Sequence, residues 1–259
     1  MRIASWNINS VRLRIGHVAR FVDIAKPDVI CLQEIKCREG EFPRNAFADM
    51  GFRHLHIVGQ KGWHGVAIVS KHKLEERLPC PPLCPAEEAR TAAVAVKGLI
   101  IQTLYVPAGG DVADPVTNPK FAHKLAFLER MKAAYQGNTS NLVLTGDLNI
   151  APGEHDVWSH KQLLDVVSHT PVETEALEAV RVRGGFTDLV RAHTPPPEKV
   201  YTWWSYRNHD WAVSNRGRRL DHIWATGDVA PNLKAAKIFP ETRSWEKPSD
   251  HAPVMVTLG

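Results

Sequence analysis

Cysteine is scarce in this sequence. It has four cysteines in 259 residues, with no C-x-x-C pair and none of the Cys/His spacings that zinc sites use. This pattern favours a reduced protein of the cytoplasm. Cys31 lies in the apolar run Asp28–Leu32 and is expected to be a small buried hydrophobe without a chemical role.

Long apolar stretches are also absent. The N-terminus, MRIASWNINS, has no signal-peptide core, and no segment approaches the roughly 18 apolar residues of a membrane helix. Internal repeats, low-complexity tracts and linkers long enough to divide the chain are missing too. We therefore expect one domain over residues 1–259, without a membrane partner.

Net charge is small. Lys and Arg total 32 against 28 Asp and Glu, which gives a charge of +4 and a sequence pI of about 8.9. This balance weakly favours an anionic partner. Apolar residues make up 44% of the chain, which is enough for the large core of an α/β domain.

The sequence does contain polar residues at the ends of apolar strands. Leu142–Pro152, LVLTGDLNIAP, predicts a strand that stops at Gly146 and leads to Asp147 and Asn149. Since side chains alternate along a strand, these two would share one face. Asp-x-Asn is also a common turn opening, because both side chains bond their own backbone. This stretch alone leaves both interpretations open.

A second polar strand end makes a functional site the better interpretation. Asp250 and His251 directly precede an apolar strand expected at Ala252–Leu258. Oxygen donors without Cys select Mg²⁺ or Mn²⁺ rather than zinc, and magnesium in turn suggests phosphoryl chemistry. Ligands also gather where strands end. Further polar residues end or begin expected strands at Asn7, Glu34, Tyr105 and Asp221.

Periodicity and capping residues predict the other elements. A helix should start after Ser10 as N-cap and stop at Pro27. Two more should begin at Asn118-Pro119 and at the capping box Thr170–Glu173. We expect further strands at 2–8, 29–32, 52–58, 65–70, 91–96, 99–106, 200–204 and 220–225.

A series of motifs resembles one known family. They are WNINS, LQEIK, QKGWHGVAIVS, LYVPAGG, LTGDLNIAP, NRGRRLDHIWA and EKPSDHAP, in the order and at about the spacing of the exonuclease III type of AP endonuclease. The similarity runs from residue 2 to about residue 258. It implies an α/β fold, a four-layer αββα sandwich in which two mixed β-sheets pack face to face and are flanked by helices.

The resemblance also implies a divalent metal at one edge of the sandwich. Glu34 matches the main ligand, with Asn7 beside it and Asp250 near enough to share the ion or hold a second. Mg²⁺ is the expected ion, with Mn²⁺ as a substitute. The wider ligand set takes in Asp147, Asn149 and His251.

Catalytic roles follow from the same resemblance. Asp147 matches the base that deprotonates the attacking water, and Asn149 the residue that orients this water. His251, paired with Asp221, would hold the scissile phosphate or assist the leaving oxygen. Tyr105 matches a phenol that donates to the phosphate. A structural His251–Asp221 ion pair is the alternative interpretation of that pair.

Further matches imply a DNA-facing side. Trp203 would line the pocket for a baseless sugar, and Trp63 would contact the ligand, or else fold back over its own hairpin. Two positions depart from the family's commoner choices. Ala108 stands where some members have Asn or Gln, and Arg218 stands where several have a large apolar residue. The full DNA-facing set is Lys36, Trp63, Arg90, Trp203 and Arg218.

We therefore expect a Mg²⁺-dependent DNA phosphodiester hydrolase of base-excision repair. It would act as a monomer on duplex DNA, cutting 5′ to abasic sites and working on 3′ ends as a 3′–5′ exonuclease and end-cleaning enzyme. One alternative is another branch of the superfamily, acting on inositol phosphates or sphingomyelin. A second is a DNA-binding module without catalysis, but every catalytic position is occupied.

Overall fold

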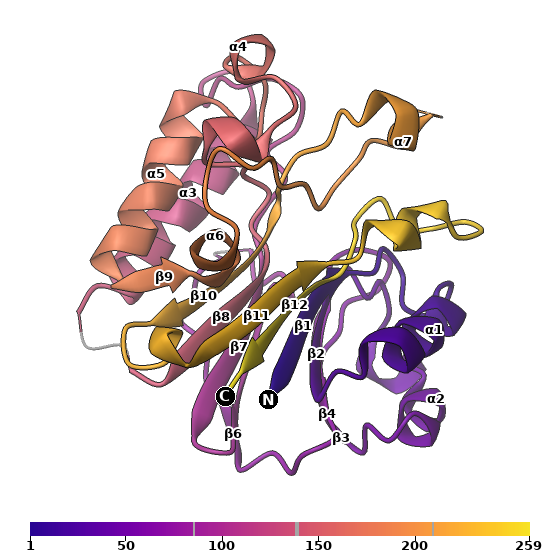
Figure 1. Ribbon diagram of the computed structural model, residues 1–259. Helices are drawn as coiled ribbons and strands as arrows, with labels where there is room; N and C mark the ends of the chain where they lie inside the picture. Colours follow the sequence, from indigo (N-terminus) through magenta and orange to yellow (C-terminus); the bar gives the residue numbers. More distant parts are fainter. Residues whose placement is uncertain (85, 138–139, 209) are drawn as a thin grey trace.

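The computed structural model describes residues 1–84, 86–137, 140–208 and 210–259, and within these ranges the strands form two mixed six-stranded sheets (Figure 1). The first has the order β11-β12-β1-β2-β4-β3, with bounds Leu233–Ile238, Val254–Leu258, Arg2–Asn7, Val29–Gln33, Val66–Ser70 and His54–Val58. The second has the order β5-β6-β7-β8-β10-β9, with bounds Glu76–Leu78, Thr91–Val96, Leu99–Tyr105, Leu142–Asp147, Asp221–Thr226 and Phe186–Asp188.

Helices cover the outer faces of the two sheets. Figure 1 shows α1 and α2 against the first sheet, and α3 and α5 against the second. These four helices span Ile15–Ala25, Arg44–Asp49, Pro119–Ala134 and Pro171–Arg183. Three shorter helices, α4, α6 and α7, span His160–Leu163, Leu189–His193 and Trp211–Ser214. All helices in the described ranges are too short or too polar to cross a membrane.

Alternation along the strands separates three apolar layers. Between the sheets, Ile3 and Cys31 of the first pack with Val143 and Ile223 of the second. A second cluster joins the outer face of the first sheet to α1 and α2, and a third joins the second sheet to α3 and α5. The expected four-layer αββα sandwich is therefore confirmed, and Cys31 is a buried core residue as expected.

The local signals were right in most places, wrong in three, and absent for the strands β5, β9 and β11. Helix α1 begins at Ile15 after Arg14 rather than after Ser10, whose φ of 85° lies outside the extended region of an N-cap. Residues 200–204 form no strand and contribute only isolated bridges, from Trp203 to Arg218 and to His251. Strand β8 does not stop at Gly146 but continues to Asp147.

Gly146 is required where β8 passes β7. Its φ is +143°, and a Cβ atom there would lie 2.0 Å from the carbonyl oxygen of Leu104. Any larger residue would push the two parallel strands apart. The glycine thus holds Asp147 directly beside Tyr105, its register partner on β7.

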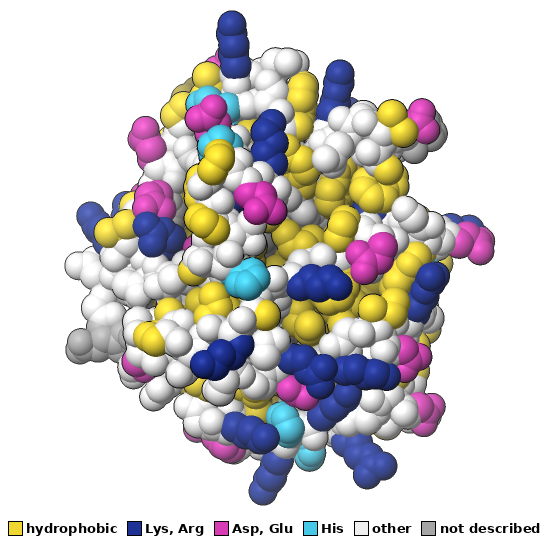
Figure 2. Space-filling model, in the orientation of Figure 1, with side chains coloured by type: hydrophobic (Ala, Val, Ile, Leu, Met, Phe, Trp, Pro, Cys, Tyr) yellow, Lys and Arg dark blue, Asp and Glu magenta, His cyan; other side chains and the backbone are white. Residues whose placement is uncertain are grey.

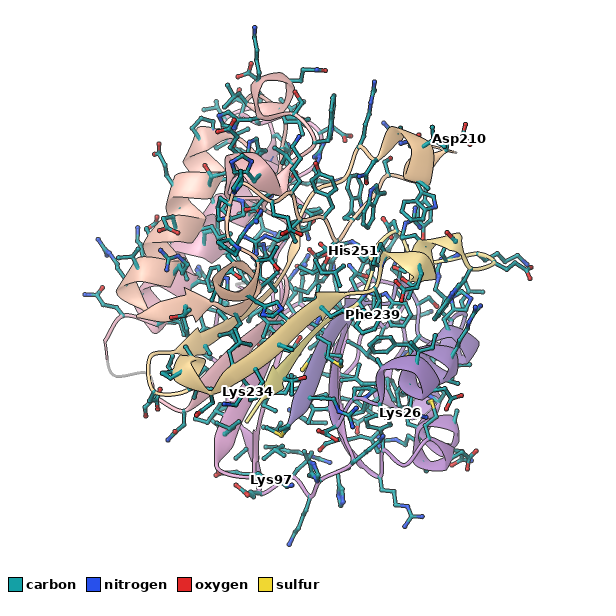
Figure 3. All side chains as sticks on the ribbon, in the orientation of Figure 1. Lys26, Lys97, Asp210, Lys234, Phe239 and His251 are labelled. Carbon is teal, nitrogen blue, oxygen red and sulfur yellow. The ribbon has the colours of Figure 1, made fainter. Side chains whose placement is uncertain are left out.

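Strand directions bring the polar ends of both sheets to one edge. β1 runs parallel to β2, so Asn7 lies beside Gln33, and β7 runs parallel to β8. β10 is antiparallel to β8, so its first residue, Asp221, pairs with Asp147. The segment before β12 returns His251 to the same edge. Figure 3 shows His251 above the strands.

Candidate active site

The polar strand ends line a cavity of about 780 Å³ at this edge. Its floor holds Glu34, Asp147 and His251, and its walls come from the segments on either side of α4 and α7. Figure 2 shows hydrophobic side chains in the recess between these two parts of the molecule, with Lys and Arg side chains projecting around it. The cavity thus combines an acidic floor with a mixed apolar and basic wall.

Glu34 lies at the centre of a hydrogen-bond network. One of its carboxylate oxygens accepts from Asn7 Nδ2 at 2.9 Å and from the Tyr105 hydroxyl at 2.8 Å. The other lies 2.8 Å from Lys36 Nζ. Burial alone would raise the pKa of Glu34, but Lys36 and these donors outweigh it and lower the pKa below its usual value. Glu34 is therefore an anion at the junction of the two sheets.

Several of these side chains are aimed by left-handed backbone. Glu34, Lys36 and Asn149 all have positive φ, at 49°, 51° and 54°. Such conformations are uncommon for residues other than glycine and cluster at functional sites. Here they redirect the chain directly after β2 and β8, so that Glu34 and Asn149 line the cavity and Lys36 reaches Glu34.

Asp147 and Asn149 come together through a turn. The strand ends at Asp147, and the backbone N–H of Asn149 donates to Asp147 Oδ1 at 2.9 Å. The side-chain amide of Asn149 donates to Asp147 Oδ2 at 3.2 Å and to the Val106 carbonyl at 2.8 Å. The turn interpretation of Asp-x-Asn was therefore right, and strand alternation was the wrong reason for their shared direction.

His251 is held between two carboxylates. Its Nδ1 lies 2.8 Å from Asp221 Oδ2, and its Nε2 lies 3.7 Å from Asp147 Oδ2. Burial would lower the pKa of His251, but the two carboxylates outweigh it and raise the pKa to about 10. Burial, together with Asp221, raises the pKa of Asp147 to about 7, although His251 opposes this shift. The arrangement favours an imidazolium flanked by carboxylates.

Asp250 is fixed by two donors from different parts of the chain. Asn9 Nδ2 donates to Asp250 Oδ1 at 3.1 Å, and the Trp203 indole N–H donates to Asp250 Oδ2 at 2.9 Å. Lys36 Nζ donates to Asn9 Oδ1 at 2.7 Å. A chain of polar contacts therefore runs from Glu34 through Lys36 and Asn9 to Asp250.

The donor set fits a hard divalent cation. Carboxylates of Glu34, Asp147, Asp221 and Asp250 meet here, while the cations in contact with them are Lys36 and His251. One buried oxygen of Asp221 has no hydrogen-bond partner in the described part of the chain. Negative charge therefore exceeds positive charge, and a cation with oxygen ligands would neutralise it.

Arg218 forms part of the cavity wall. Its Nη1 donates to the Val167 carbonyl at 3.0 Å and to Ser168 Oγ at 2.7 Å, and its guanidinium lies 5.4 Å from the ring centroid of Trp203. Both Trp203 and Arg218 line the cavity. The structure thus brings the expected pocket aromatic and the unusual arginine into direct contact.

The other DNA-facing candidates occupy contrasting environments. Trp63 is 71% exposed, so its ring is not folded into the protein. Arg90 is only 5% exposed; its Nη1 donates to the Tyr105 carbonyl at 3.1 Å, and its guanidinium stacks 4.8 Å from the Tyr105 ring centroid. Arg90 therefore supports Tyr105 from behind, and any effect on DNA binding would be indirect.

Comparison with known proteins identifies the family. Residues 4–251 match the sequence profile of the Endonuclease/Exonuclease/phosphatase family. This chain belongs to that family. Exodeoxyribonuclease III of Haemophilus influenzae is 27% identical over 98% of both chains, and the DNA repair nuclease APEX1 of Danio rerio is 28% identical over 100% of this chain and 82% of its own. These relatives place the chain in the exonuclease III type of AP endonuclease.

Solved structures of the family agree with this fold over its full length. An AP endonuclease from Archaeoglobus fulgidus superposes with a TM-score of 0.92 at 31% identity, covering 100% of this chain and 99% of that one. The 3′ phosphatase NExo from Neisseria, bound to a product DNA hairpin, gives a TM-score of 0.91 at 31% identity with the same coverage. Nucleases of this family depend on metal ions, in agreement with the oxygen-rich floor of the cavity.

Sequence reasoning missed one buried residue that supports this family's site. Lys124 of α3 is fully buried, and its Nζ donates to the carbonyls of Asn149 at 2.8 Å and Ala108 at 3.3 Å, while also pairing with Glu173. It thereby ties α3 and α5 to the turn that carries Asn149. The sequence did contain a signal for this residue: a lysine at the helical spacing of the apolar face of α3, between Phe121 and Leu128.

Proposed function

We propose that this protein is a DNA-repair hydrolase that cuts the phosphodiester bond 5′ to an abasic site and acts as a 3′–5′ exonuclease on duplex DNA. The observation that carries the proposal is the convergence of Glu34, Asp147 and the His251–Asp221 pair in one cavity. Relatives named as exodeoxyribonuclease III, DNA repair nuclease and AP endonuclease match this chain along its length. The chain is accordingly a nuclease.

The ion of this site is proposed to be Mg²⁺, which Mn²⁺ can replace. Glu34 would be its main ligand, with Asn7 and Asp250 nearby. Asp147, which accepts from the same Asn7 amide as Glu34, and Asn149 would complete the set. When bound, the ion would supply positive charge to the phosphate oxygens. His251 suits this ligand set least, because both of its ring nitrogens face carboxylates, which favour the protonated ring.

The protein's own residues would move the protons. Asp147 accepts a proton from the attacking water, and Asn149, fixed to Asp147 and Val106, holds that water in line. His251, oriented by Asp221, donates toward the phosphate or the departing oxygen. The Tyr105 hydroxyl, which donates its one proton to Glu34, would add a second donor once that proton turns from Glu34 to the phosphate. A phosphodiester anion needs this combination of base and donors.

Duplex DNA would lie across the cavity mouth. Trp203 and Arg218 would form the wall against a flipped baseless sugar, because such a sugar leaves the helix at lower cost than a paired nucleotide. Lys36 and Trp63 would contact the strand beside it. We further propose that residues 1–259 act as one catalytic domain and as a monomer, in the cytoplasm, where the four free cysteines stay reduced.

Rival functions are less well supported. Inositol phosphates and sphingomyelin are substrates of other branches of the superfamily, but the relatives matched here are named as DNA enzymes. A binding module without catalysis would have no use for an assembled His251–Asp221 pair beside Glu34. DNA hydrolysis therefore explains more of the residues that line the cavity than either rival function does.

One gel assay tests the proposal. A single duplex sequence is prepared with an internal abasic analogue, with an intact strand and with a 3′ phosphate, and each is incubated with Mg²⁺ or with EDTA. We expect cleavage 5′ to the abasic analogue and removal of 3′ groups, both abolished by EDTA. An inositol phosphate is incubated with Mg²⁺ in parallel. The proposed DNA hydrolase activity is overturned if all three duplexes stay intact with Mg²⁺ while phosphate is released from the inositol phosphate.

A further inference from the structure

A second cluster of metal-binding side chains lies outside the cavity. Cys84 and Glu88 lie in the segment between β5 and β6, and His123 lies on α3. Cys84 Sγ is 3.4 Å from His123 Nε2 and 3.6 Å from Glu88 Oε2. One atom from each side chain lies within 4.8 Å of the others, and all three residues are partly exposed. An ion from solvent could therefore reach them.

We propose that Cys84, Glu88 and His123 form a second metal site, which binds a thiophilic divalent cation such as Zn²⁺. Zinc lies roughly 2.0–2.3 Å from nitrogen, oxygen and sulfur ligands, so in a tetrahedral site neighbouring ligand atoms are about 3.3–3.8 Å apart. The two sulfur distances already have this length. The ligand atoms of Glu88 and His123 lie within 4.8 Å of each other, so small side-chain movements would bring all three to this spacing, and the Cys84 thiol would release its proton on binding.

Ligand chemistry separates this cluster from the active site. A thiolate with an imidazole and a carboxylate selects a borderline-soft ion, whereas the oxygen donors around Glu34 select Mg²⁺. A fourth position remains for water or for His64, whose Nε2 lies 3.6 Å from Glu88 Oε1. Cys84 and His123 are 39 residues apart, so the spacing of Cys and His in the sequence could not indicate this site.

The cluster also has the outer support that metal sites use. Arg90 Nε donates to Glu88 Oε2 and so fixes the orientation of the carboxylate. Each carboxylate oxygen has a second lone pair, which leaves Glu88 able to bind an ion while paired with Arg90. The same guanidinium donates to the Tyr105 carbonyl, so the second site is attached to a rigid part of the fold.

Absorption spectroscopy with Co²⁺ tests the proposal without any nuclease assay. Co²⁺ alone is titrated into the wild-type protein and into Cys84→Ser, His123→Ala and Cys80→Ser. We expect a thiolate-to-cobalt charge-transfer band in wild type and Cys80→Ser, and none in Cys84→Ser. His123→Ala should weaken Co²⁺ binding by at least roughly 10-fold, because even outer-shell changes cost that much. Added Zn²⁺ should abolish the band, and millimolar Mg²⁺ should leave it unchanged.

Cys80→Ser is the matched control, since Cys80 lies four residues earlier in the same segment and is similarly partly buried. Thermal unfolding gives a second readout, because an ion that binds the folded state raises Tm. We expect Zn²⁺ to raise the Tm of Cys80→Ser more than that of Cys84→Ser. The proposal is overturned if wild type shows no thiolate band, or if Cys84→Ser keeps it while Cys80→Ser loses it.

Discussion

At the scale of single residues, Glu34 should determine metal dependence. Its carboxylate sits where Asn7, Tyr105 and Lys36 converge, so removing its charge weakens the attraction for a hard cation while leaving the strands intact. We expect Glu34→Ala to lose most nuclease activity and to recover part of it at raised Mg²⁺ or Mn²⁺. Cleavage rates measured across a Mg²⁺ titration check this.

The control for Glu34 is an exposed carboxylate on the same fold. Glu76 lies at the start of β5 and is exposed, so Glu76→Ala should leave the Mg²⁺ dependence unchanged. Circular dichroism would establish that Glu34→Ala is folded. Full activity of Glu34→Ala in EDTA would contradict the role given to this residue.

Asp147 and His251 should affect the chemical step more than DNA binding. Each moves or stabilises charge as the phosphate is attacked, so we expect Asp147→Asn and His251→Ala to lower kcat by roughly 10² or more while DNA still binds. Single-turnover rates and fluorescence anisotropy measure the two properties separately. If affinity fell in proportion to rate in both variants, the proposed roles would be wrong.

Arg218 should contribute one phosphate contact. Its Nη1 is anchored to Val167 and Ser168, which leaves the rest of the guanidinium at the cavity wall. We expect Arg218→Leu to weaken binding to all duplexes and to lower the slope of log K against log salt by about 0.9. Arg183→Leu, at the exposed end of α5, serves as the control. Faster abasic cleavage by Arg218→Leu would instead show that this arginine obstructs the pocket.

At the scale of secondary-structure elements, capping signals were accurate at α3 and α5, while the Asp188 cap of α6 was not anticipated. Asn118 accepts from the Lys120 N–H at the start of α3, and Thr170 and Glu173 form the predicted capping box of α5. Helix α1 has no side-chain cap, so the sequence held nothing that marked its first residue. Strand β11 was missed because Lys234 and Lys237 interrupt its apolar pattern on an exposed edge of the sheet.

Helices α3 and α5 should depend on their buried ion pair. Lys124 and Glu173 are both fully buried, so removing one partner leaves an uncompensated charge inside the protein. We expect Lys124→Met to destabilise the fold by about 3 kcal/mol in urea unfolding, within the range seen for broken buried pairs. The displaced Asn149 turn should also lower nuclease activity.

Two further variants isolate the effect of Lys124. Lys132→Met removes a more exposed partner of Glu129 on the same helix and should cost less than about 1 kcal/mol. The double variant Lys124→Met/Glu173→Gln removes both charges and should recover part of the lost stability. Equal destabilisation by Lys124→Met and Lys132→Met would show that the buried pair does not hold α3 to α5.

At the scale of the whole molecule, the edge that carries the site could be predicted because strand ends are local signals, whereas the four-layer sandwich was implied by the resemblance to the exonuclease III family. Asn7, Glu34, Asp147 and His251 each stand beside an apolar strand, and strand order then gathers them. Contacts between distant segments have no such local signal in the sequence. Asn9 touching Asp250, for example, depends on how the sheets pack. Such contacts follow from the fold, and only the fold reveals them.

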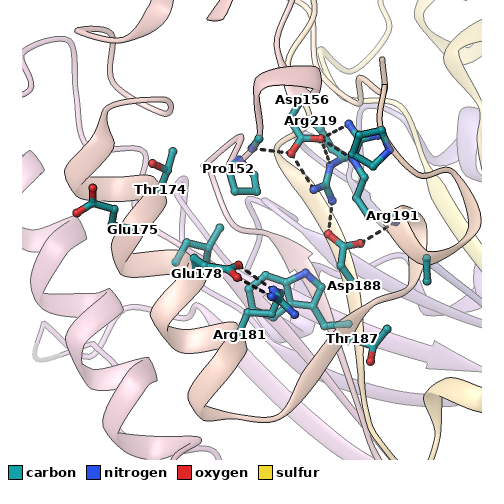
Figure 4. A pocket seen from close by; sticks show the side chains of 15 residues that line it. Pro152, Asp156, Thr174, Glu175, Glu178, Arg181, Thr187, Asp188, Arg191 and Arg219 are labelled. Atoms are coloured by element: carbon teal, nitrogen blue, oxygen red, sulfur yellow. Dashed lines mark hydrogen bonds and ion pairs between the residues drawn. The ribbon is translucent and has the colours of Figure 1, made fainter. Parts of the chain in front are cut away.

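The buried cluster around Arg219 joins three distant segments and should set the acid stability of the whole fold. Arg219 bonds Asp156 at 2.6 and 3.0 Å and Asp188 at 2.7 Å, and Arg191 also bonds Asp156 (Figure 4). Burial alone would raise the pKa of both carboxyls, but Arg219, helped by Arg191 at Asp156 and by His222 at Asp188, outweighs it and lowers the pKa of each below its usual value. Protonating them therefore costs more in the folded than in the unfolded state.

Because the folded-state pKa is lowered, this stabilisation is complete at pH values above the unfolded-state pKa of Asp, about 3.9. It is lost as the pH falls from there through the lower folded-state pKa. We expect Asp188→Asn to lower the free energy of unfolding by roughly 1–3 kcal/mol at neutral pH, because one face of Arg219 loses its charged partner. The deficit should begin to shrink below about pH 3.9 and continue to shrink as the pH falls toward the lowered folded-state pKa of Asp188, where wild type loses the same interaction. Urea unfolding across this pH range, with exposed Asp49→Asn as control, measures both effects. A deficit that stayed constant with pH would mean that Asp188 stabilises the fold by packing and not by its charge.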